Sequence, residues 1–255
     1  MEKYVVAIPA RLGSTRLPNK AILDINGIPM IKRVCMQATK SNAFEVIACI
    51  DDKKIEDAIG SLDRVRVCMT DSNAKSGSDR IAMMIKKFNL DGDTIIVNVQ
   101  GDEPLINPSH IDLVVKTLID TKSDMATLCA KITNKDDVFD PNCVKVVLNN
   151  KSRALYFSRC PIPYERDNFS KNDLITADHL HHIGIYAYRA KTVLDFASME
   201  QTPLEKAESL EQLRMLENGY TIGVSITDTP PETGVDTVDD LERIRKIIEG
   251  IEGKI

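Results

Sequence analysis

Residues 4–20, YVVAIPARLGSTRLPNK, join an apolar strand to a turn-rich loop that carries three cations, Arg11, Arg16 and Lys20. A loop of this kind at the carboxyl end of a first strand is where open α/β sheets bind polyphosphates. Glycine and small hydroxyl residues let backbone N–H groups approach phosphate oxygens, and the cationic side chains neutralise the phosphate charge. The alternative is a surface turn with solvated basic residues.

This loop has neither of two common phosphate-binding spacings. Both G-x-x-x-x-G-K-[ST] and G-x-G-x-x-G are missing from it, so P-loop ATPases and ordinary dinucleotide dehydrogenases are disfavoured. The net charge of −5 argues against a nucleic-acid-binding surface. A small anion that meets a local group of cations fits the chain better than a polymer does.

Composition indicates an ordinary globular protein. The 255 residues, 43% hydrophobic, are enough for one ample core and a subdomain. Met1 is followed almost at once by a strand, and no apolar run approaches membrane-spanning length, so we expect a cytoplasmic protein that binds no membrane. Neither zinc nor a disulfide framework is indicated, because the six cysteines lack C-x-x-C spacing. They are Cys35, Cys49, Cys68, Cys129, Cys143 and Cys160.

Short apolar runs alternate with longer amphipathic segments in the first half of the chain, and this order predicts a parallel, doubly wound α/β sheet. The strands are apolar throughout, as in VVAI and TIIVNV, which is typical of strands covered by helices on both faces. Strands are expected at 4–9, 45–50, 66–69 and 94–99, and helices at about 29–40, 53–60, 78–89 and 108–120.

The second half of the chain has a different pattern. The short strand-like runs MATLCAKI, CVKVVL, ALYFS and HIGIYAY follow one another without long helices between them, which indicates an antiparallel or mixed insertion. Helices are expected again at about 205–218 and 237–249, and the polar stretch 165–178 is the best candidate for a mobile loop. We therefore expect one domain over residues 1–255 with an inserted subdomain at about 125–200.

Acidic residues follow a buried strand in TIIVNVQGDEPLI, residues 94–106. The strand runs into Gly101, Asp102 and Glu103. Carboxylates at the carboxyl end of a central strand are suited to holding a hard cation, and magnesium is the natural choice beside a nucleoside triphosphate. The structural alternative is a Gly-Asp turn, with Pro104 ending the strand.

A second acidic segment, TGVDTVDDLERI, covers residues 233–244. Asp239 and Asp240 are most simply interpreted as acids in the first turn of a helix, with Thr237 as its N-cap. Asp236 precedes that cap and is placed to face the carboxyl edge of the sheet. Taken alone, helix capping is the simpler explanation for this segment.

Several other candidates have low specificity when taken one at a time. AKSGSDRI, residues 74–81, is a helix entrance that serves equally as a cap or as an anion or ribose contact. Isolated Arg, His and Glu residues are usually surface ion pairs or structural groups. Joint occurrence adds weight to Arg159 at a strand end, His182 and Tyr186 on a strand, and Glu211 and Gln212 on an amphipathic helix.

Eight segments, in order across nearly the whole chain, carry a family resemblance. They are IPARLGSTRLP, SGSDRI, VNVQGDEPLI, NCVKVVL, ALYFSRCPIPY, HIGIYAYR, PLEKAESLEQLRMLENG and GVDTVDDLERIR. The chain resembles the 3-deoxy-manno-octulosonate cytidylyltransferases, the CMP-Kdo synthetases of lipopolysaccharide biosynthesis. The resemblance implies a cytoplasmic homodimer with a Rossmann-like nucleotidyltransferase fold, in which residues 125–200 serve sugar binding and dimerisation. Members activate the eight-carbon acid sugar Kdo with CTP and Mg²⁺ and release pyrophosphate.

The resemblance also implies residue roles. Arg11, Lys20, Asp102 and Asp236 would be catalytic, and the two aspartates would hold Mg²⁺. The nucleotide would be bound by Arg11, Ser14, Lys20, Ser76, Gly77, Arg80 and Gln100, and the sugar acid by Arg159, His182, Tyr186, Glu211 and Gln212.

The chain departs from the family pattern at a few positions. Where the family commonly reads RLPGKPL, this chain carries Asn19 and Ala21, and Ala74 replaces a common histidine. Asparagine tolerates left-handed backbone geometry, so the loop can keep its turn. These changes leave the identity of the sugar substrate undecided, with the 8-amino-3,8-dideoxy analogue of Kdo as the alternative to Kdo. A sialic acid cytidylyltransferase is disfavoured because its Gly-Gly-Ser-Lys run is absent. A non-catalytic nucleotide-sugar sensor is also disfavoured, because a protein that only binds needs no paired metal site.

Overall fold

The computed structural model describes residues 2–14, 16–169, 176–230 and 234–252. The stretch 165–178, expected to be a mobile loop, includes residues 170–175, which lie outside the described residues. Contacts between Cα atoms divide the chain into two compact units. Unit 1 consists of Met1–Asp112, Arg189–Ala197 and Pro231–Ile255, and unit 2 consists of Leu113–Tyr188 and Ser198–Pro230.

Unit 1 contains parallel strands in the order β6, β1, β4, β5. β1 (Tyr4–Pro9) pairs with β4 (Glu45–Ile50) on one side and with β6 (Ile95–Asn98) on the other, and β4 also pairs with β5 (Val65–Met69). The chain therefore runs outward from β1 to β5 and returns to the opposite side of β1. This reversal makes a switch point between β1 and β6, where open α/β sheets bind ligands.

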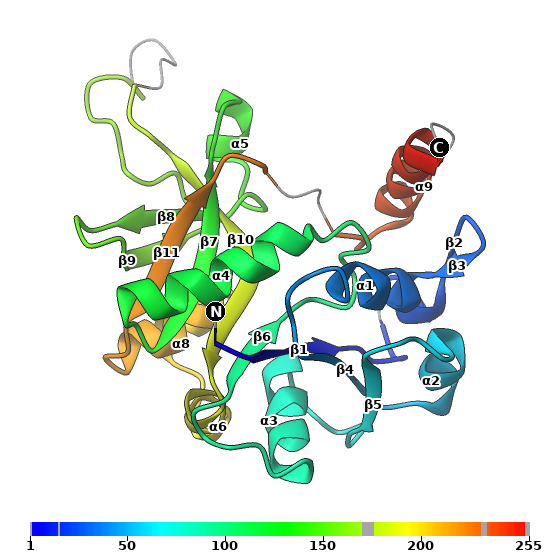
Figure 1. The fold of residues 1–255 in the computed structure, drawn as a ribbon. Coiled ribbons are helices and arrows are strands. Elements are labelled where there is room, and N and C mark those ends of the chain that lie inside the picture. The colour runs from blue at the N-terminus through cyan, green and yellow to red at the C-terminus, as the bar shows by residue number, and fades with distance from the viewer. Residues whose placement is uncertain (1, 15, 170–175, 231–233, 253–255) are drawn as a thin grey trace. The chain divides into compact units, whose positions relative to one another are not determined.

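Helices cover both faces of these strands, which confirms the doubly wound α/β class. Figure 1 shows α1 (Met30–Ala38) and α3 (Gly77–Lys87) on opposite faces, and α2 (Lys53–Ile59) packs beside α1. The buried residues of α1 recur at helical spacing, so one stripe of the helix faces the apolar strands. That stripe consists of Met30, Ile31, Val34, Cys35 and Ala38.

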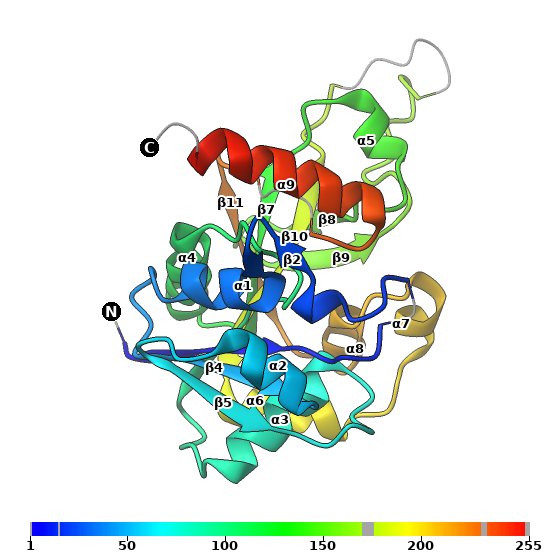
Figure 2. The same cartoon turned by 90° about the vertical axis from the view of Figure 1, so that its right-hand side faces the viewer.

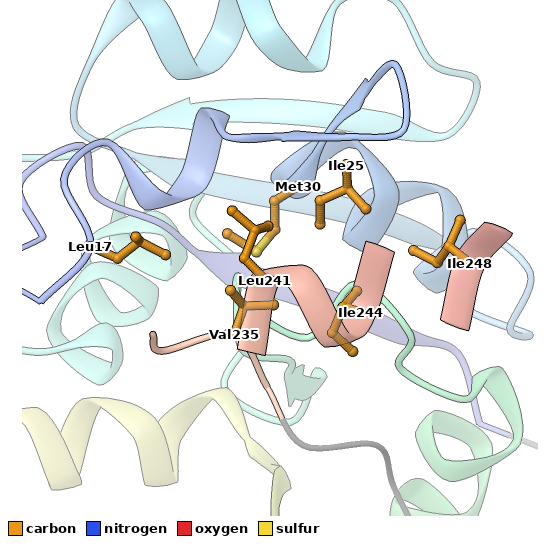
Figure 3. Packing of buried hydrophobic residues seen from close by; sticks show 7 residues of the cluster. All are labelled: Leu17, Ile25, Met30, Val235, Leu241, Ile244 and Ile248. Atoms are coloured by element: carbon orange, nitrogen blue, oxygen red, sulfur yellow. The ribbon is translucent and has the colours of Figure 1, made fainter. Parts of the chain in front are cut away.

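The C-terminal helix α9 (Val238–Glu252) packs against an early part of the chain. Figure 2 shows it alongside β2 (Asp24–Ile25), which forms a hairpin with β3 (Ile28–Pro29). Figure 3 shows the apolar cluster that joins them. Burying each such side chain contributes about 1.5–3 kcal/mol, so the cluster fixes both the loop after β1 and the segment before α9. Its members are Leu17, Ile25, Met30, Val235, Leu241, Ile244 and Ile248.

Unit 2 contains a mixed set of strands, as the short apolar runs predicted. β7 (Met125–Lys131) pairs in parallel with β11 (Ile222–Thr227) and antiparallel with β10 (Leu180–Arg189). β8 (Lys145–Leu148) pairs antiparallel with both β9 (Ala154–Ser158) and β10. Helix α4 (Pro108–Thr121) precedes these strands, α5 (Lys135–Phe139) connects β7 to β8, and α6 (Ala190–Ser198) follows β10. Helix α6 and strand β11 were not expected from the sequence.

The prediction of a single helix at 205–218 is wrong, because two helices form there. α7 (Pro203–Glu208) is followed by its C-cap Ser209, whose backbone is left-handed with φ 52°. Glu205 accepts hydrogen bonds from Arg214 of α8 (Gln212–Glu217) at 2.8 and 2.5 Å, and this buried ion pair joins the two helices. Glu211 therefore lies ahead of α8, outside the helix in which the sequence analysis placed it.

Two further observations bear on the composition argument. No helix in the described part of the chain is both long enough and apolar enough to cross a membrane. Cys35, Cys49, Cys68 and Cys129 are buried free thiols, whereas Cys160 is an exposed free thiol.

Candidate active site

The carboxyl end of β1 is closely packed against two glycines of unit 1. A Cβ atom on Gly101 would lie 2.8 Å from the carbonyl oxygen of Pro9, so only glycine allows this approach of the two backbones. A Cβ atom on Gly77 would lie 3.0 Å from Pro9 Cγ. The loop after β6 and the N-terminus of α3 are thereby held at the point where the basic loop begins.

The basic loop keeps its turn without the usual glycine. Asn19 adopts the left-handed conformation, φ 56° and ψ 28°, directly before the short helix η1 (Lys20–Ile22). This observation confirms that asparagine can replace glycine here. The side chains of Arg11 and Arg16 are exposed and that of Ser14 is half-buried, so they remain accessible to an anionic ligand.

Lys20 lies between the two aspartates that were expected to hold a metal. Its Nζ atom donates to Asp102 Oδ2 at 2.5 Å and to Asp236 Oδ1 at 2.9 Å. Burial alone would lower the pKa of Lys20, but the Asp102 and Asp236 carboxylates outweigh burial and raise that pKa above its ordinary value. The ammonium therefore stays charged at neutral pH and offsets one of the two carboxylate charges. The exposed Arg16 adds a contact of 3.2 Å to Asp236.

The backbone brings the two aspartates together across the chain. Val235 donates its N–H to the carbonyl oxygen of Asp102 at 2.9 Å, and its side chain is fully buried in the apolar cluster of unit 1. Gly234 allows this approach, since a Cβ atom there would lie 3.3 Å from the same carbonyl oxygen. The buried Val235 therefore places the partly exposed carboxylate of Asp236 beside Asp102.

The donor set of this pair fits a divalent cation. The two carboxylates already share one cation, the Lys20 ammonium, and their side chains are 29% and 43% exposed. Among the described residues, no group of three or more His, Cys, Asp or Glu side chains is arranged for a metal. Mg²⁺ commonly uses one or two protein carboxylates together with water and substrate phosphates. Asp102 and Asp236 would therefore hold it most naturally with a triphosphate present.

Arg80 is a buried residue that stabilises the basic loop through Asp51. Its guanidinium is almost fully buried and donates to Thr70, to the carbonyl of Asp71 and to Asp51 Oδ2 at 2.9 Å. The other oxygen of Asp51 accepts from the N–H of Leu12 at 2.9 Å. Direct contact of Arg80 with the nucleotide stays a prediction. The observed hydrogen bonds indicate that Arg80 positions the basic loop through Asp51. Asp51 was not among the site residues expected from the sequence.

We expect Asp51→Ala to lower the free energy of unfolding by about 3–5 kcal/mol, because it leaves the Arg80 charge buried and unpaired. It should also weaken CTP binding, since Leu12 loses its acceptor. Urea unfolding and calorimetric titration with CTP measure the two effects. Asp57→Ala is the matched control, because Asp57 is 67% exposed and contacts only the exposed Lys53 at 3.5 Å in the described ion pairs. An equal effect of both substitutions would contradict the stabilising role of the Arg80–Asp51 pair.

The remaining nucleotide candidates lie on the same edge of unit 1. Ser76 accepts from the N–H of Asp79 at 3.2 Å and the Asp79 carboxylate accepts from the N–H of Ser76 at 3.0 Å, so Ser76 is an N-cap of α3. Gln100 is half-buried and follows β6. A ribose or anion contact by either residue stays a prediction.

Arg159, in unit 2, is anchored at the end of β9. Its Nε atom donates to the carbonyl of Glu208 at 2.7 Å and its Nη1 atom to the carbonyl of Pro141 at 2.9 Å. The Glu208 carboxylate accepts from the Arg159 N–H at 2.9 Å, and the Arg159 carbonyl accepts from the buried Lys145 at 2.8 Å. These bonds leave Nη2 of the guanidinium with no hydrogen-bond partner among the described residues, which suits capture of a carboxylate.

His182 and Tyr186 lie close together on β10, with ring centroids 5.5 Å apart. The edge of Phe157 also contacts the His182 ring at 4.9 Å. Burial is the main cause that lowers the pKa of His182 to about 3, with His181 adding to it. His182 is therefore neutral at physiological pH and is suited to a hydroxyl group rather than to a carboxylate.

Gln212 is the first residue of α8 and is 3% exposed. Its Nε2 atom is buried with no hydrogen-bond partner among the described residues. A buried amide donor without a partner is costly, and a polar ligand that accepts from this atom would remove that cost. Glu211, one residue earlier, is exposed. The observed contacts join His182 to Tyr186 and tie Arg159 to Glu208, three residues before Glu211.

Comparisons with known proteins show which family the chain belongs to. A family profile described as cytidylyltransferase matches residues 5–225. A 3-deoxy-manno-octulosonate cytidylyltransferase of Aliivibrio fischeri (strain MJ11) is 48% identical over 246 residues, covering 96% of this chain and 98% of that protein. A 3-deoxy-manno-octulosonate cytidylyltransferase 2 of Actinobacillus pleuropneumoniae is 46% identical over 249 residues, covering 96% and 98%.

A solved structure shares the fold at full length. It is a CMP:2-keto-3-deoxy-manno-octonic acid synthetase complexed with CTP, which is 37% identical, with a TM-score of 0.88 and coverage of 98% of this chain and 100% of that one. The fold and the matched profile define the chain as a nucleotidyltransferase of the cytidylyltransferase class. Within that class, it belongs to the 3-deoxy-manno-octulosonate cytidylyltransferase family.

Proposed function

We propose that this chain transfers the cytidylyl group of CTP to Kdo, giving CMP-Kdo and pyrophosphate for lipopolysaccharide biosynthesis. The observation that carries the proposal is the grouping of Lys20, Asp102 and Asp236 beside a basic loop at the switch point of unit 1. The names of the relatives support Kdo as the acceptor, and the solved relative supports CTP as the donor.

The reaction needs positioning and charge neutralisation more than covalent chemistry. The anomeric 2-hydroxyl of Kdo attacks the α-phosphorus of CTP in line and gives up its proton to solvent. An oxygen–phosphorus bond forms, and the bond to pyrophosphate breaks. No Ser or Cys nucleophile is required. Holding both reactants in line and offsetting the charge that develops on phosphate oxygens account for the rate in such transfers.

Unit 1 supplies the cations and the metal-binding carboxylates. Arg11 and Lys20 would bind the triphosphate and offset charge on the departing pyrophosphate, with Ser14 and Arg16 in the same loop. Mg²⁺ held by Asp102 and Asp236 would polarise the α-phosphate. The Lys20 ammonium contacts both carboxylates and offsets one of their two negative charges. With Mg²⁺ held by Asp102 and Asp236, the flexible Lys20 side chain would be free to contact phosphate oxygens.

Unit 2 supplies groups whose chemistry matches a sugar acid. The remaining donors of Arg159 suit the carboxylate, the neutral imidazole of His182 suits a hydroxyl, and the buried amide of Gln212 can donate to a sugar oxygen. Tyr186 and Glu211 would complete the set. This division of labour leaves the phosphates to cations and the sugar hydroxyls to neutral polar groups.

A pyrophosphate-release assay with CTP tests the proposal. Purified enzyme with Mg²⁺ is given Kdo, its 8-amino-3,8-dideoxy analogue or sialic acid, at matched concentrations. We expect the highest kcat/KM with Kdo. Preference for the 8-amino analogue would replace the proposed acceptor, and binding of CTP without turnover of any acid sugar would support a sensor instead.

We also expect strong preference for CTP over ATP and GTP, because a site shaped for a pyrimidine has no room for a purine and mismatches its hydrogen-bonding edge. Discrimination of at least about a hundredfold in kcat/KM is typical when a site hydrogen-bonds its substrate. Competing the three nucleotides at fixed Kdo measures it. Comparable turnover with ATP would remove the cytidylyl assignment.

The homodimer and the cytoplasmic location implied by the resemblance stay part of the proposal. Unit 2 exposes two large apolar side chains on its strands, Leu155 in β9 at 60% and Ile226 in β11 at 47%. Contiguous apolar patches are typical of surfaces that a second subunit covers, whereas single exposed apolar residues are ordinary, so these two side chains do not by themselves indicate an interface. Analytical ultracentrifugation of the full chain measures the oligomeric state.

A further inference from the structure

Thr127 in β7 lies against an irregularity in β10. The register between these strands shifts between Ile183 and Tyr186. The fully buried Thr127 hydroxyl lies 2.9 Å from the carbonyl oxygen of Ile183 and 2.8 Å from that of Ile185. Its third neighbour is His182 Nε2, at 3.1 Å. One hydroxyl therefore serves three polar atoms.

The proton count at Thr127 determines the state of the imidazole. A hydroxyl has one hydrogen to donate and two lone pairs that accept. The two carbonyl oxygens can only accept, so one or both of them must take the single hydrogen. If the hydrogen pointed at His182 Nε2 instead, both carbonyls would face hydroxyl lone pairs within 2.9 Å. The arrangement is satisfied only when Nε2 carries a hydrogen and donates it to the hydroxyl.

We propose that Thr127 is a positioning residue for sugar recognition, which holds His182 in the tautomer protonated at Nε2 and so presents unprotonated Nδ1 as an acceptor for a sugar hydroxyl. This inference rests on the proposed sugar-binding role of His182. Thr127 itself touches no substrate in this account and acts through the imidazole.

The surroundings of His182 support the assignment. The Phe157 and Tyr186 rings contact the imidazole at centroid distances of 4.9 and 5.5 Å and restrict its rotation. Burial keeps the ring neutral, as its lowered pKa indicates. His182 Nδ1 has no hydrogen-bond partner among the described residues. A neutral ring with an unpartnered acceptor matches a hydroxyl donor.

The tautomer can be observed directly by nitrogen-15 NMR of the full chain. The chain has only four histidines, so the His182 signals are assigned by their loss in His182→Asn. We expect a protonated Nε2 and an unprotonated Nδ1 in the wild-type enzyme. Thr127→Val keeps the shape of the side chain without its hydroxyl and should shift the His182 signals toward the Nδ1-protonated form. Thr127→Ser should restore the wild-type signals.

Steady-state kinetics link the tautomer to the sugar. Thr127→Val should raise the KM for Kdo about three- to tenfold, the effect of losing one hydrogen bond, with the KM for CTP unchanged and recovery in Thr127→Ser. Thr117→Val is the matched control in unit 2. Its buried hydroxyl also makes two bonds, to the Leu113 carbonyl and to Ser225, and neither partner is a histidine.

Each outcome decides a separate point. Protonated Nδ1 in the wild-type enzyme, or an unchanged His182 spectrum in Thr127→Val, overturns the inference. An equal rise in the KM for Kdo in Thr117→Val also overturns it, because the effect would then be general destabilisation. If Thr127→Val does not fold, the wild-type and Thr127→Ser spectra still decide the tautomer. Turnover of some other acid sugar in place of Kdo would overturn the proposed substrate, while the NMR result on Thr127 would stand by itself.

Discussion

Asp102→Asn and Asp236→Asn are each expected to lower turnover about a hundredfold or more while the enzyme stays folded, because loss of metal-binding charge acts on the transition state. Folding should survive because an asparagine oxygen can still accept the hydrogen bond that Lys20 donates to each position. Pyrophosphate release at saturating CTP, Kdo and Mg²⁺ measures the loss. Thermal unfolding verifies that each variant is folded.

Asp240→Asn is the matched control for this prediction. Asp240 lies four residues after Asp236, and its carboxylate accepts from the Asp236 N–H at 3.2 Å and from Thr237. An asparagine oxygen can still accept these bonds, so Asp240→Asn should cost less than the roughly 1 kcal/mol of a lost cap and should leave turnover nearly intact. Isothermal titration with Mg²⁺ and CTP together supplies a second readout, in which only the Asp102 and Asp236 variants lose metal-dependent binding. Near-normal activity in both Asp102→Asn and Asp236→Asn would contradict the proposal that these two residues hold Mg²⁺.

Arg159→Ala should raise the KM for Kdo about ten- to a hundredfold and leave CTP affinity nearly unchanged, because a charge-assisted contact with the sugar carboxylate is lost. Arg11→Ala should show the opposite pattern: it should weaken CTP binding and leave the KM for Kdo nearly unchanged. Calorimetric titration of each variant with CTP alone, followed by kinetics in Kdo, separates the two effects. Loss of CTP binding in a folded Arg159→Ala enzyme would show that Arg159 has been assigned to the wrong substrate.

The substitution at Arg159 also removes two hydrogen bonds to backbone carbonyls, those of Glu208 and Pro141. Arg153→Ala controls for that loss within unit 2, because Arg153 Nη2 donates to the carbonyl of Thr121 at 3.0 Å. A rise in the KM for Kdo that is confined to Arg159→Ala identifies recognition of the substrate. Equal effects in both variants would identify a loss of packing instead.

Local physics accounts for the features that sequence patterns predicted well. The apolar runs of β1, β4 and β6 indicate strands covered on both faces, and the structure shows those parallel strands within one residue of their expected bounds. Thr237 accepts from the Asp240 N–H at 3.1 Å, as a cap should. The left-handed Asn19 also follows from residue type alone.

Other features depended on residues far apart in the chain. The break at Ser209 follows from the buried pair between Glu205 and Arg214, whose partner choice no helical periodicity reveals. Arg80 matched a ligand motif, yet its charge is balanced by Asp51, 29 residues away, so its observed role is to brace the basic loop.

By itself, the sequence determined the fold class, the family and the types of residue available for catalysis, because apolar period, turn chemistry and ordered motifs are written in neighbouring residues. Only the tertiary structure decided which charges meet. Lys20 contacts carboxylates 82 and 216 residues away, and Thr127 reaches the His182 ring 55 residues away. Partners at such separations are set by strand order and register, and hydrogen bonding over about 3 Å depends on that placement rather than on any local pattern.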